Sequence, residues 1–214
     1  MSRPDRPATI NDWLGIPEDR RAQLIHGTIV DDPFPGLKHG AAQGAVFAEI
    51  RPYNRRQRRG GGPGGWWLSL EVDMVIGGIG CRPDVVGWRR EKLPRPPEPD
   101  ERGLVTVMPD FVGEVLSSST ARYDTGPKRD AYFKAGVTFY WLIDPAYKTL
   151  TILERGDRGY VIVLVAGPDE TVRAPPFDGV EIPVGGLFLD EETEVDEETE
   201  ETEEGKARGE ETPP

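Results

Sequence analysis

The chain has 214 residues, of which 36% are apolar, with 26 glycines, 21 prolines and the single cysteine Cys81. This length supports one domain with a substantial core. One cysteine excludes an internal disulfide framework and a cysteine-based metal site, and no apolar run is long enough for a signal peptide or a membrane span. We therefore expect a soluble cytoplasmic protein without a membrane partner.

The formal net charge of −12 is concentrated at the C-terminal end. Residues 190–214 contain thirteen acidic residues against Lys206 and Arg208, which leaves residues 1–189 with a net charge of −1. The acidic segment is low in complexity and cannot bury enough surface to offset chain entropy. We predict a disordered, solubilising tail over 190–214, with mimicry of a polyanion in a basic groove as the alternative. The near-neutral body is compatible with a nucleic-acid partner.

Residues 1–20 are assigned to an N-terminal extension, and the first predicted elements come from the stretch 10–32. A short helix leads into a strand near 24–30, and apolar residues at helical spacing between positions 42 and 50 predict a helix that ends near Pro52. After a glycine-rich loop, the sequence "WLSLEVDMVI" over 67–76 alternates between apolar and polar residues. This alternation predicts one half-exposed strand, with Glu71 and Asp73 on its solvent-facing side.

The remaining elements complete one sheet. The sequences "CRPDVVGW" (81–88) and "DFVGEVLS" (110–117) predict a second and a third strand, separated by an exposed proline-rich loop. A helix over 123–137 with Gly136 at its end, a fourth strand over 138–144 and a hairpin over 148–167 follow. This order predicts an α/β (α+β) domain with a central mixed sheet flanked by helices.

A carboxylate in the middle of the buried third strand is the first chemical signal. Glu114 lies there between apolar residues, and Asp84 follows Pro83 at the start of the second strand. If the strands are neighbours, both carboxylates can bind one Mg²⁺ or Mn²⁺ ion, which prefers oxygen ligands. Such an ion polarises a phosphodiester and activates water. Lys128, in the first turn of the next helix, can reach the same site, and Tyr132 follows one turn later.

Each of these residues has a structural alternative. Asp84 can be a turn or cap residue, Glu114 can be paired with a buried arginine, and Lys128 can be a solvated lysine at the start of a helix. A lysine near a helix N-terminus is slightly unfavourable, which favours a functional reason for its position.

Two segments carry a resemblance to a known family: "RPDVVGWRREKLP" and, after it, "PDFVGEVLSSSTARYDTGPKRDAYFKAGVTFYWLIDPAYKTLTILE". They resemble the Uma family of restriction-type endonucleases in the PD-(D/E)XK nuclease superfamily. The resemblance covers roughly residues 22–154. It implies a restriction-endonuclease-like core, which we place at 21–189, and Mg²⁺-dependent cleavage of DNA. It implies that Asp84 and Glu114 are metal ligands and that Lys128 is the lysine of the catalytic set, moved from the strand to the helix.

Other residues are candidates for accessory roles. Gln43 can reach the site from the first long helix, as a Glu or Gln does in the related nucleases, and His39, Glu71 and Tyr132 are further candidates. Where the family often has acids after its first strand, this sequence has His26 and Thr28.

A basic cluster follows the first long helix. It consists of Arg51, Arg55, Arg56, Arg58 and Arg59. These arginines can bind DNA phosphates, or they can form a basic surface without a partner.

Two functions follow from this sequence. The first is a metal-dependent endonuclease (a hydrolase of DNA phosphodiester bonds), for which cleavage of both strands by one site per chain favours a two-fold homodimer. The second is a catalytically decayed nuclease-like module that binds DNA or protein.

Overall fold

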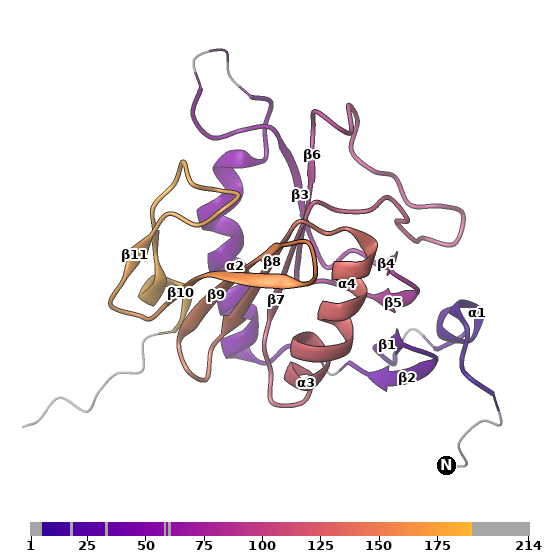
Figure 1. Cartoon of the computed structure of the whole chain (residues 1–214). Helices are drawn as coiled ribbons and strands as arrows, with labels where there is room; N and C mark the ends of the chain where they lie inside the picture. The colour runs from indigo at the N-terminus through magenta and orange to yellow at the C-terminus, as the bar shows by residue number, and fades with distance from the viewer. Residues whose placement is uncertain (1–5, 18, 33, 58, 60, 190–214) are drawn as a thin grey trace, which may run out of the picture.

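The computed structural model of the chain describes residues 6–17, 19–32, 34–57, 59 and 61–189. The predicted acidic tail and Arg58 lie outside these residues. A six-stranded sheet in the order β10-β9-β8-β7-β6-β3 forms the centre of the molecule (Figure 1). No helix in the described part of the chain is both long and apolar enough to cross a membrane.

The central sheet is mixed. Strands β7 and β8 are parallel, whereas all other neighbouring pairs in this sheet are antiparallel. Its strands are β3 (Trp66–Leu70), β6 (Val85–Arg89), β7 (Phe111–Val115), β8 (Phe139–Asp144), β9 (Thr149–Arg155) and β10 (Tyr160–Ala166). The predicted third and fourth strands and the final hairpin are confirmed, as is the mixed α/β fold class.

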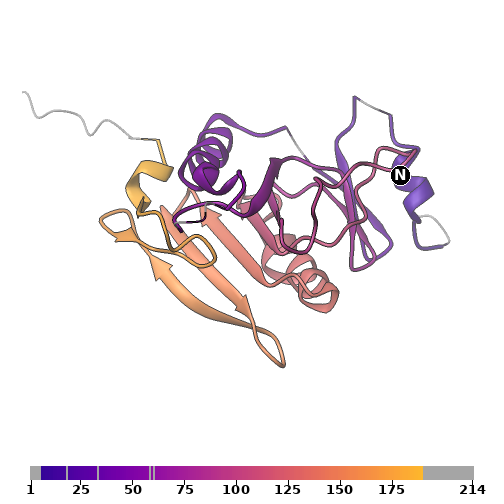
Figure 2. The same ribbon diagram turned by 90° about the horizontal axis from the view of Figure 1, so that it is seen from above.

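Helices cover both faces of this sheet (Figure 2). Helix α2 (Leu37–Ile50) lies on one face and ends before a 3₁₀ turn, η1 (Arg51–Tyr53), that contains Pro52. The other face is covered by a helical segment that runs through α3 (Ala121–Tyr123), the π-helical turn η2 (Asp124–Lys128) and α4 (Arg129–Ala135). Helix α4 ends at Gly136, whose φ of 92° is left-handed, as the sequence predicted.

Each face has its own apolar core. Ala42, Val46 and Ile50, one helical turn apart on α2, pack against Phe111 and Trp141 of the sheet. On the opposite face Ala131 and Tyr132 pack against a different set, which includes Val86, Val112 and Tyr140. The alternation along β7 therefore directs Glu114, two residues after Val112, toward the helix that carries Tyr132.

The predicted single strand over 67–76 is wrong. Glu71 has a φ of 48°, which ends β3, and the chain then turns into a second sheet. This sheet has the order β2-β1-β5-β4, formed by β1 (Ala22–Ile25), β2 (Thr28–Asp31), β4 (Met74–Ile76) and β5 (Ile79–Cys81). The predicted second strand is likewise divided, because β5 ends at Cys81 and β6 begins at Val85.

A glycine turn fixes the second sheet against the helix. Gly77, between β4 and β5, has a φ of 56°, and a Cβ there would lie 2.5 Å from the carbonyl oxygen of Ala131. Only glycine permits both this backbone conformation and this approach. The contact holds the second sheet against α4, the helix that also carries Tyr132.

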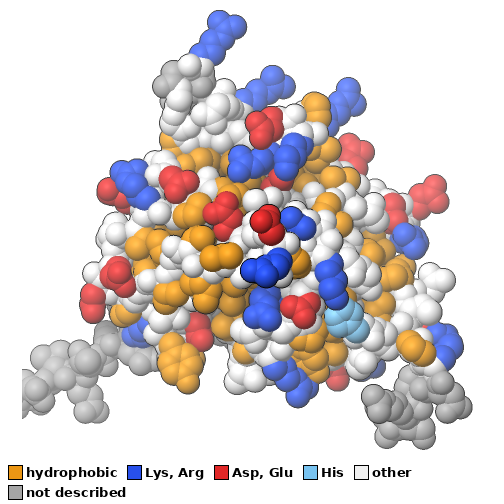
Figure 3. All heavy atoms as spheres, in the orientation of Figure 1, with side chains coloured by type: hydrophobic (Ala, Val, Ile, Leu, Met, Phe, Trp, Pro, Cys, Tyr) orange, Lys and Arg blue, Asp and Glu red, His pale blue; other side chains and the backbone are white. Residues whose placement is uncertain are grey.

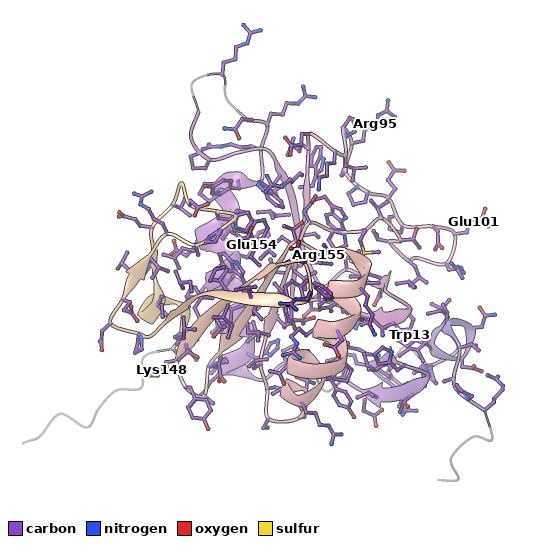
Figure 4. The ribbon with its side chains drawn as sticks, viewed as in Figure 1. Trp13, Arg95, Glu101, Lys148, Glu154 and Arg155 are labelled. Carbon is purple, nitrogen blue, oxygen red and sulfur yellow. The ribbon has the colours of Figure 1, made fainter. Side chains whose placement is uncertain are left out.

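The two ends of the described chain pack onto this core. Helix α1 (Ile10–Leu14) begins with a capping box between Thr9 and Asp12, and the indole of Trp13 donates a hydrogen bond of 2.7 Å to the carbonyl of Ala22 (Figure 4). The C-terminal elements are β11 (Thr171–Val172), β12 (Ile182–Pro183) and the 3₁₀ turn η3 (Val184–Leu187).

Candidate active site

A polar cavity of about 210 Å³ opens where the two sheets meet the start of α2 and the π-helical turn. Carboxylates and cations line it together. The acidic residues are Asp32, Asp84, Glu114 and Asp124, and the basic residues are Arg21, His39, Arg82 and Lys128. Because the two sets are equal in number, the cavity can hold a phosphate and a cation without a large excess of either charge.

Asp84 is held from two sides. It lies just before β6, where the peptide N–H of Val115 donates a 2.7 Å hydrogen bond to Oδ2. Nε2 of His39, in the first turn of α2, lies 2.9 Å from Oδ1. These contacts fix the carboxylate next to the end of β7, although each oxygen keeps a lone pair for a further partner.

Glu114 is 2% exposed and points toward the π-helical turn. The ammonium of Lys128 lies 2.7 Å from Oε1, and the hydroxyl of Tyr132 donates a 2.7 Å hydrogen bond to the same oxygen. Within the described residues, Oε2 receives no hydrogen bond. Burial raises the pKa of Glu114, and the negative charges of Asp124 and Asp84 raise it further, whereas Lys128 opposes the shift.

The buried partner of Glu114 is Lys128 and not an arginine. Lys128 is 2% exposed and also lies 2.8 Å from Oδ1 of Asp124, one turn earlier in the helix. Burial alone would lower the pKa of Lys128, but the two carboxylates raise it well above its usual value. The structure therefore contradicts the solvated alternative for Lys128 and makes this side chain a fixed cation.

The hydroxyl of Tyr132 is a permanent donor in this site. Burial, together with the negative charge around it, raises the pKa of Tyr132 well above the ordinary value. Tyr132 thus keeps its proton and holds Oε1 of Glu114 in place.

Two accessory candidates from α2, His39 and Gln43, contact Asp84. His39 lines the cavity, whereas Gln43, Glu71 and Tyr132 do not. Gln43 donates a 3.0 Å hydrogen bond to the backbone carbonyl of Asp84, and its amide lies 3.5 Å from Oε1 of Glu71. Glu71 is 3.4 Å from Arg21. Burial lowers the pKa of His39, but the hydrogen bond to Asp84 and nearby carboxylates have the larger effect and raise it above 6.5.

The donor set suits one hard divalent cation. Mg²⁺ is commonly bound by one or two carboxylates, with waters and substrate phosphates completing its shell. Asp84 and Glu114 line the same cavity and have free lone pairs. Among the described residues, no three His, Cys, Asp or Glu side chains form a metal-binding group. The residues therefore fit an ion held by two carboxylates, and they do not fit a cage built from protein ligands alone.

Several predicted residues lie elsewhere. The described arginines of the basic cluster, Arg51, Arg55, Arg56 and Arg59, do not line the cavity, and neither do His26 and Thr28 of the β1–β2 hairpin. His26 is exposed with a φ of 46°.

Sequence reasoning missed the four other charged residues of the cavity. The one signal for Asp124 is its spacing of four residues from Lys128, which is typical of an ion pair along a helix. Arg21, Asp32 and Arg82 flank strands of the second sheet, which no local pattern in the sequence predicts.

Comparisons with known proteins agree with this architecture. The family model described as "Uma2: Putative restriction endonuclease" matches residues 7–185. The crystal structure of "a putative nuclease belonging to DUF820" from Anabaena variabilis ATCC 29413 is similar, with a TM-score of 0.66 and 24% sequence identity. The match covers 85% of this chain and 98% of that chain, and at this identity it bears on the fold. No curated protein matches the chain.

Proposed function

This chain belongs to the Uma2 family, and from that premise we propose that it is a metal-dependent endonuclease that hydrolyses DNA phosphodiester bonds. One observation carries the proposal. The carboxylates of Asp84 and Glu114 line one cavity, and the buried ammonium of Lys128 lies 2.7 Å from Glu114. The two carboxylates can bind a metal ion that polarises a phosphodiester and activates water, and the cation can stabilise charge on the phosphate.

In this proposal, Asp84 and Glu114 hold Mg²⁺ or Mn²⁺. When bound, such an ion supplies Lewis acidity and lowers the pKa of a bound water. Lys128 remains protonated because of Asp124 and Glu114, so it acts as a cation and not as a base. Its role is to stabilise negative charge that develops on the phosphate. His39 and Gln43 orient the Asp84 segment through its carboxylate and its backbone carbonyl.

A second candidate function is favoured by one feature of the same geometry. In the described residues every cavity carboxylate has a basic side chain within 4 Å, as in the 2.9 Å contact of Asp84 with His39. A site in which these ion pairs are permanent would not take up a metal. The chain would then be a nuclease-like module that binds DNA without cleaving it.

We further propose that two copies of the chain act together on duplex DNA. Strand β10 is an edge of the central sheet, and Figure 3 shows an apolar patch over this strand. Its exposed apolar residues are Val161, Ile162, Val163 and Val165, and β10 carries no charge. An uncharged, apolar strand edge can pair with another uncharged, apolar strand edge, and β10 of a second copy of the chain is such an edge. The opposite edge is covered, since Asn54 exchanges two hydrogen bonds with the backbone of Leu68 in β3.

The cytoplasm remains our proposed location. The thiol of Cys81 is buried and free, which suits a reducing compartment.

Cleavage of supercoiled plasmid and of single-stranded DNA tests the proposed activity. Wild type would be incubated with Mg²⁺, with Mn²⁺ and with EDTA, beside the isosteric variants Asp84→Asn and Glu114→Gln. Matched controls are Asp130→Asn and Glu154→Gln, which remove carboxylates outside the cavity (Figure 4 labels Glu154).

We expect metal-dependent cleavage that falls by about a hundredfold or more in the two cavity variants and is unchanged in the controls. Cleavage that survives both cavity variants would place the activity elsewhere or in a contaminant. If the folded wild type binds DNA but does not cleave it with either metal, the module is the correct function.

A further inference from the structure

A second and larger hollow lies on the same face of the central sheet as the two carboxylates. It has a volume of about 570 Å³ and is formed by β3, the end of β6 and the proline-rich loop. We call it the β3–β6 groove, and define it by Trp67, Trp88, Arg90, Pro96, Pro97 and Pro99. Val86 and Trp88 of β6 pack in the same core as Val112 of β7, on the side of the sheet to which Glu114 points. Asp84 and Arg90 directly flank β6, at positions that continue the alternation of Val86 and Trp88.

The floor of the groove is a preformed flat platform. The guanidinium of Arg90 lies 3.3 Å from the centre of the Trp67 ring, and its Nε donates a 2.8 Å hydrogen bond to the carbonyl of Trp66. Both indoles are also fixed, because Trp67 donates to the carbonyl of Leu93 and Trp88 donates to that of Val107. Stacked planar groups of this kind bind the flat face of a nucleobase.

The charge around the groove is unbalanced. Arg90 forms no ion pair within the described residues, and both burial and the positive charge of Arg56 lower its pKa. Arg55, Arg56, Arg59 and Arg95 are exposed and also lack ion pairs in this part of the chain.

Lys and Arg side chains gather along the upper end of the molecule, and Arg95 projects into solvent there (Figures 3 and 4). Glu91 and Glu98 lie on the same loop but form no ion pair with these arginines. Arginines held near each other without acidic partners favour an anionic ligand.

We propose that the β3–β6 groove binds an unpaired nucleotide of the DNA strand that enters the candidate active site. The base stacks on the Arg90–Trp67 platform, and the neighbouring phosphates contact Arg55, Arg56 and Arg95. This inference rests on the proposed function, because that function makes DNA the substrate. It adds a preference for DNA with an unpaired segment.

The spacing between groove and cavity sets the length of that segment. Arg90 is six residues beyond Asp84, which is about 20 Å at roughly 3.3 Å per residue of strand. A stacked DNA strand advances about 3.4 Å per nucleotide, so about six nucleotides separate the two sites. Oligonucleotides clearly longer than this can occupy both sites, whereas a trinucleotide can occupy only one.

The test measures binding in EDTA, where cleavage cannot interfere. Fluorescence anisotropy would follow a labelled single-stranded 12-mer and a blunt duplex of equal length, with wild type, Arg90→Ala, Arg90→Lys and Arg56→Ala. Arg90→Lys keeps the charge but removes the planar group. Arg158→Ala removes an exposed arginine from the β9–β10 turn and is the matched control. Thermal unfolding of each variant establishes that it is folded.

We expect Arg90→Ala and Arg90→Lys to weaken single-strand binding by roughly tenfold, with a smaller effect on the duplex. Arg56→Ala changes an exposed side chain and should weaken binding. It should also reduce the slope of log affinity against log salt concentration by about one. Arg158→Ala should bind like wild type.

Three outcomes would overturn the proposal. The first is full single-strand binding by Arg90→Lys, which would mean that charge alone attracts the DNA. The second is an equal loss of affinity for the single strand and the duplex in the Arg90 variants. The third is the absence of single-strand binding by wild type. Failure of the nuclease proposal would look different, since it appears as absent cleavage with Mg²⁺ while groove-dependent binding in EDTA remains.

Discussion

The ammonium of Lys128 lies 2.7 Å from Oε1 of Glu114, although one residue is on a strand and the other on the helix that follows it. The π-helical turn makes this contact possible, because it brings Lys128 and Asp124 to the sheet side of the helix, where both are buried. Turns of this type are frequent at functional sites. The site thus contains a buried lysine shared by two carboxylates.

Asp124 should determine the position of Lys128. Asp124→Asn keeps the shape of the side chain but removes the charge that lies 2.8 Å from the ammonium. We expect a loss of about 2 kcal/mol in the free energy of unfolding and a tenfold to hundredfold loss in the cleavage rate, roughly, because Lys128 is displaced. Urea unfolding and plasmid cleavage measure the two effects. Asp130→Asn, on the exposed side of the same helix, is the control, and a normal cleavage rate in Asp124→Asn would show that Lys128 needs no such support.

The ion pair of His39 with Asp84 predicts a pH-dependent stability of the metal-free protein. The pKa of His39 is raised in the folded state, so the pair stabilises fully below about pH 6.5 and this stabilisation is lost as the pH rises through the raised value. His39→Gln should therefore lower the free energy of unfolding more near pH 6 than near pH 9. A histidine is mostly charged at roughly the first pH and neutral at roughly the second. Urea unfolding in EDTA measures this difference. An equal cost at both pH values would show that the pair carries no net charge interaction.

The sequence predicts those parts of the fold and site that depend on neighbouring residues, and it does not predict those that depend on distant segments of the chain. Glu114 and Lys128 are predictable because a carboxylate inside an apolar strand requires a partner. The break at Glu71 is not, since the alternation of residues 67–76 continues through it and only the left-handed backbone of Glu71 redirects the chain. Asp32 and Arg21 are also hidden, because they reach the cavity through a hairpin far from Glu114 in the sequence.

Strand β10 should hold two copies of the chain together. Ile162 and Val165 are each 59% exposed, and lysine at either position would bring an uncompensated charge into an apolar interface. We expect wild type to sediment as a dimer and Ile162→Lys and Val165→Lys to sediment as monomers. Tyr147→Lys, at an 80% exposed residue outside β10, is the control. A monomeric wild type, or dimers that persist in both variants, would rule out this interface.

The affinity of the cavity for Mn²⁺ should rise with pH. Burial raises the pKa of Glu114, so the carboxylate holds a proton over part of the neutral range, and metal binding must displace this proton. A titration at slightly alkaline pH therefore gives the site its best opportunity to bind.

The measurement that tests the account most directly is a titration of wild type and Glu114→Gln with Mn²⁺, followed by electron paramagnetic resonance. We predict one site in the wild type and a loss of affinity of roughly tenfold or more in Glu114→Gln, with Glu154→Gln equal to wild type. Absence of Mn²⁺ binding by the folded wild type, or equal binding by Glu114→Gln, would contradict the central claim that Asp84 and Glu114 hold a catalytic metal.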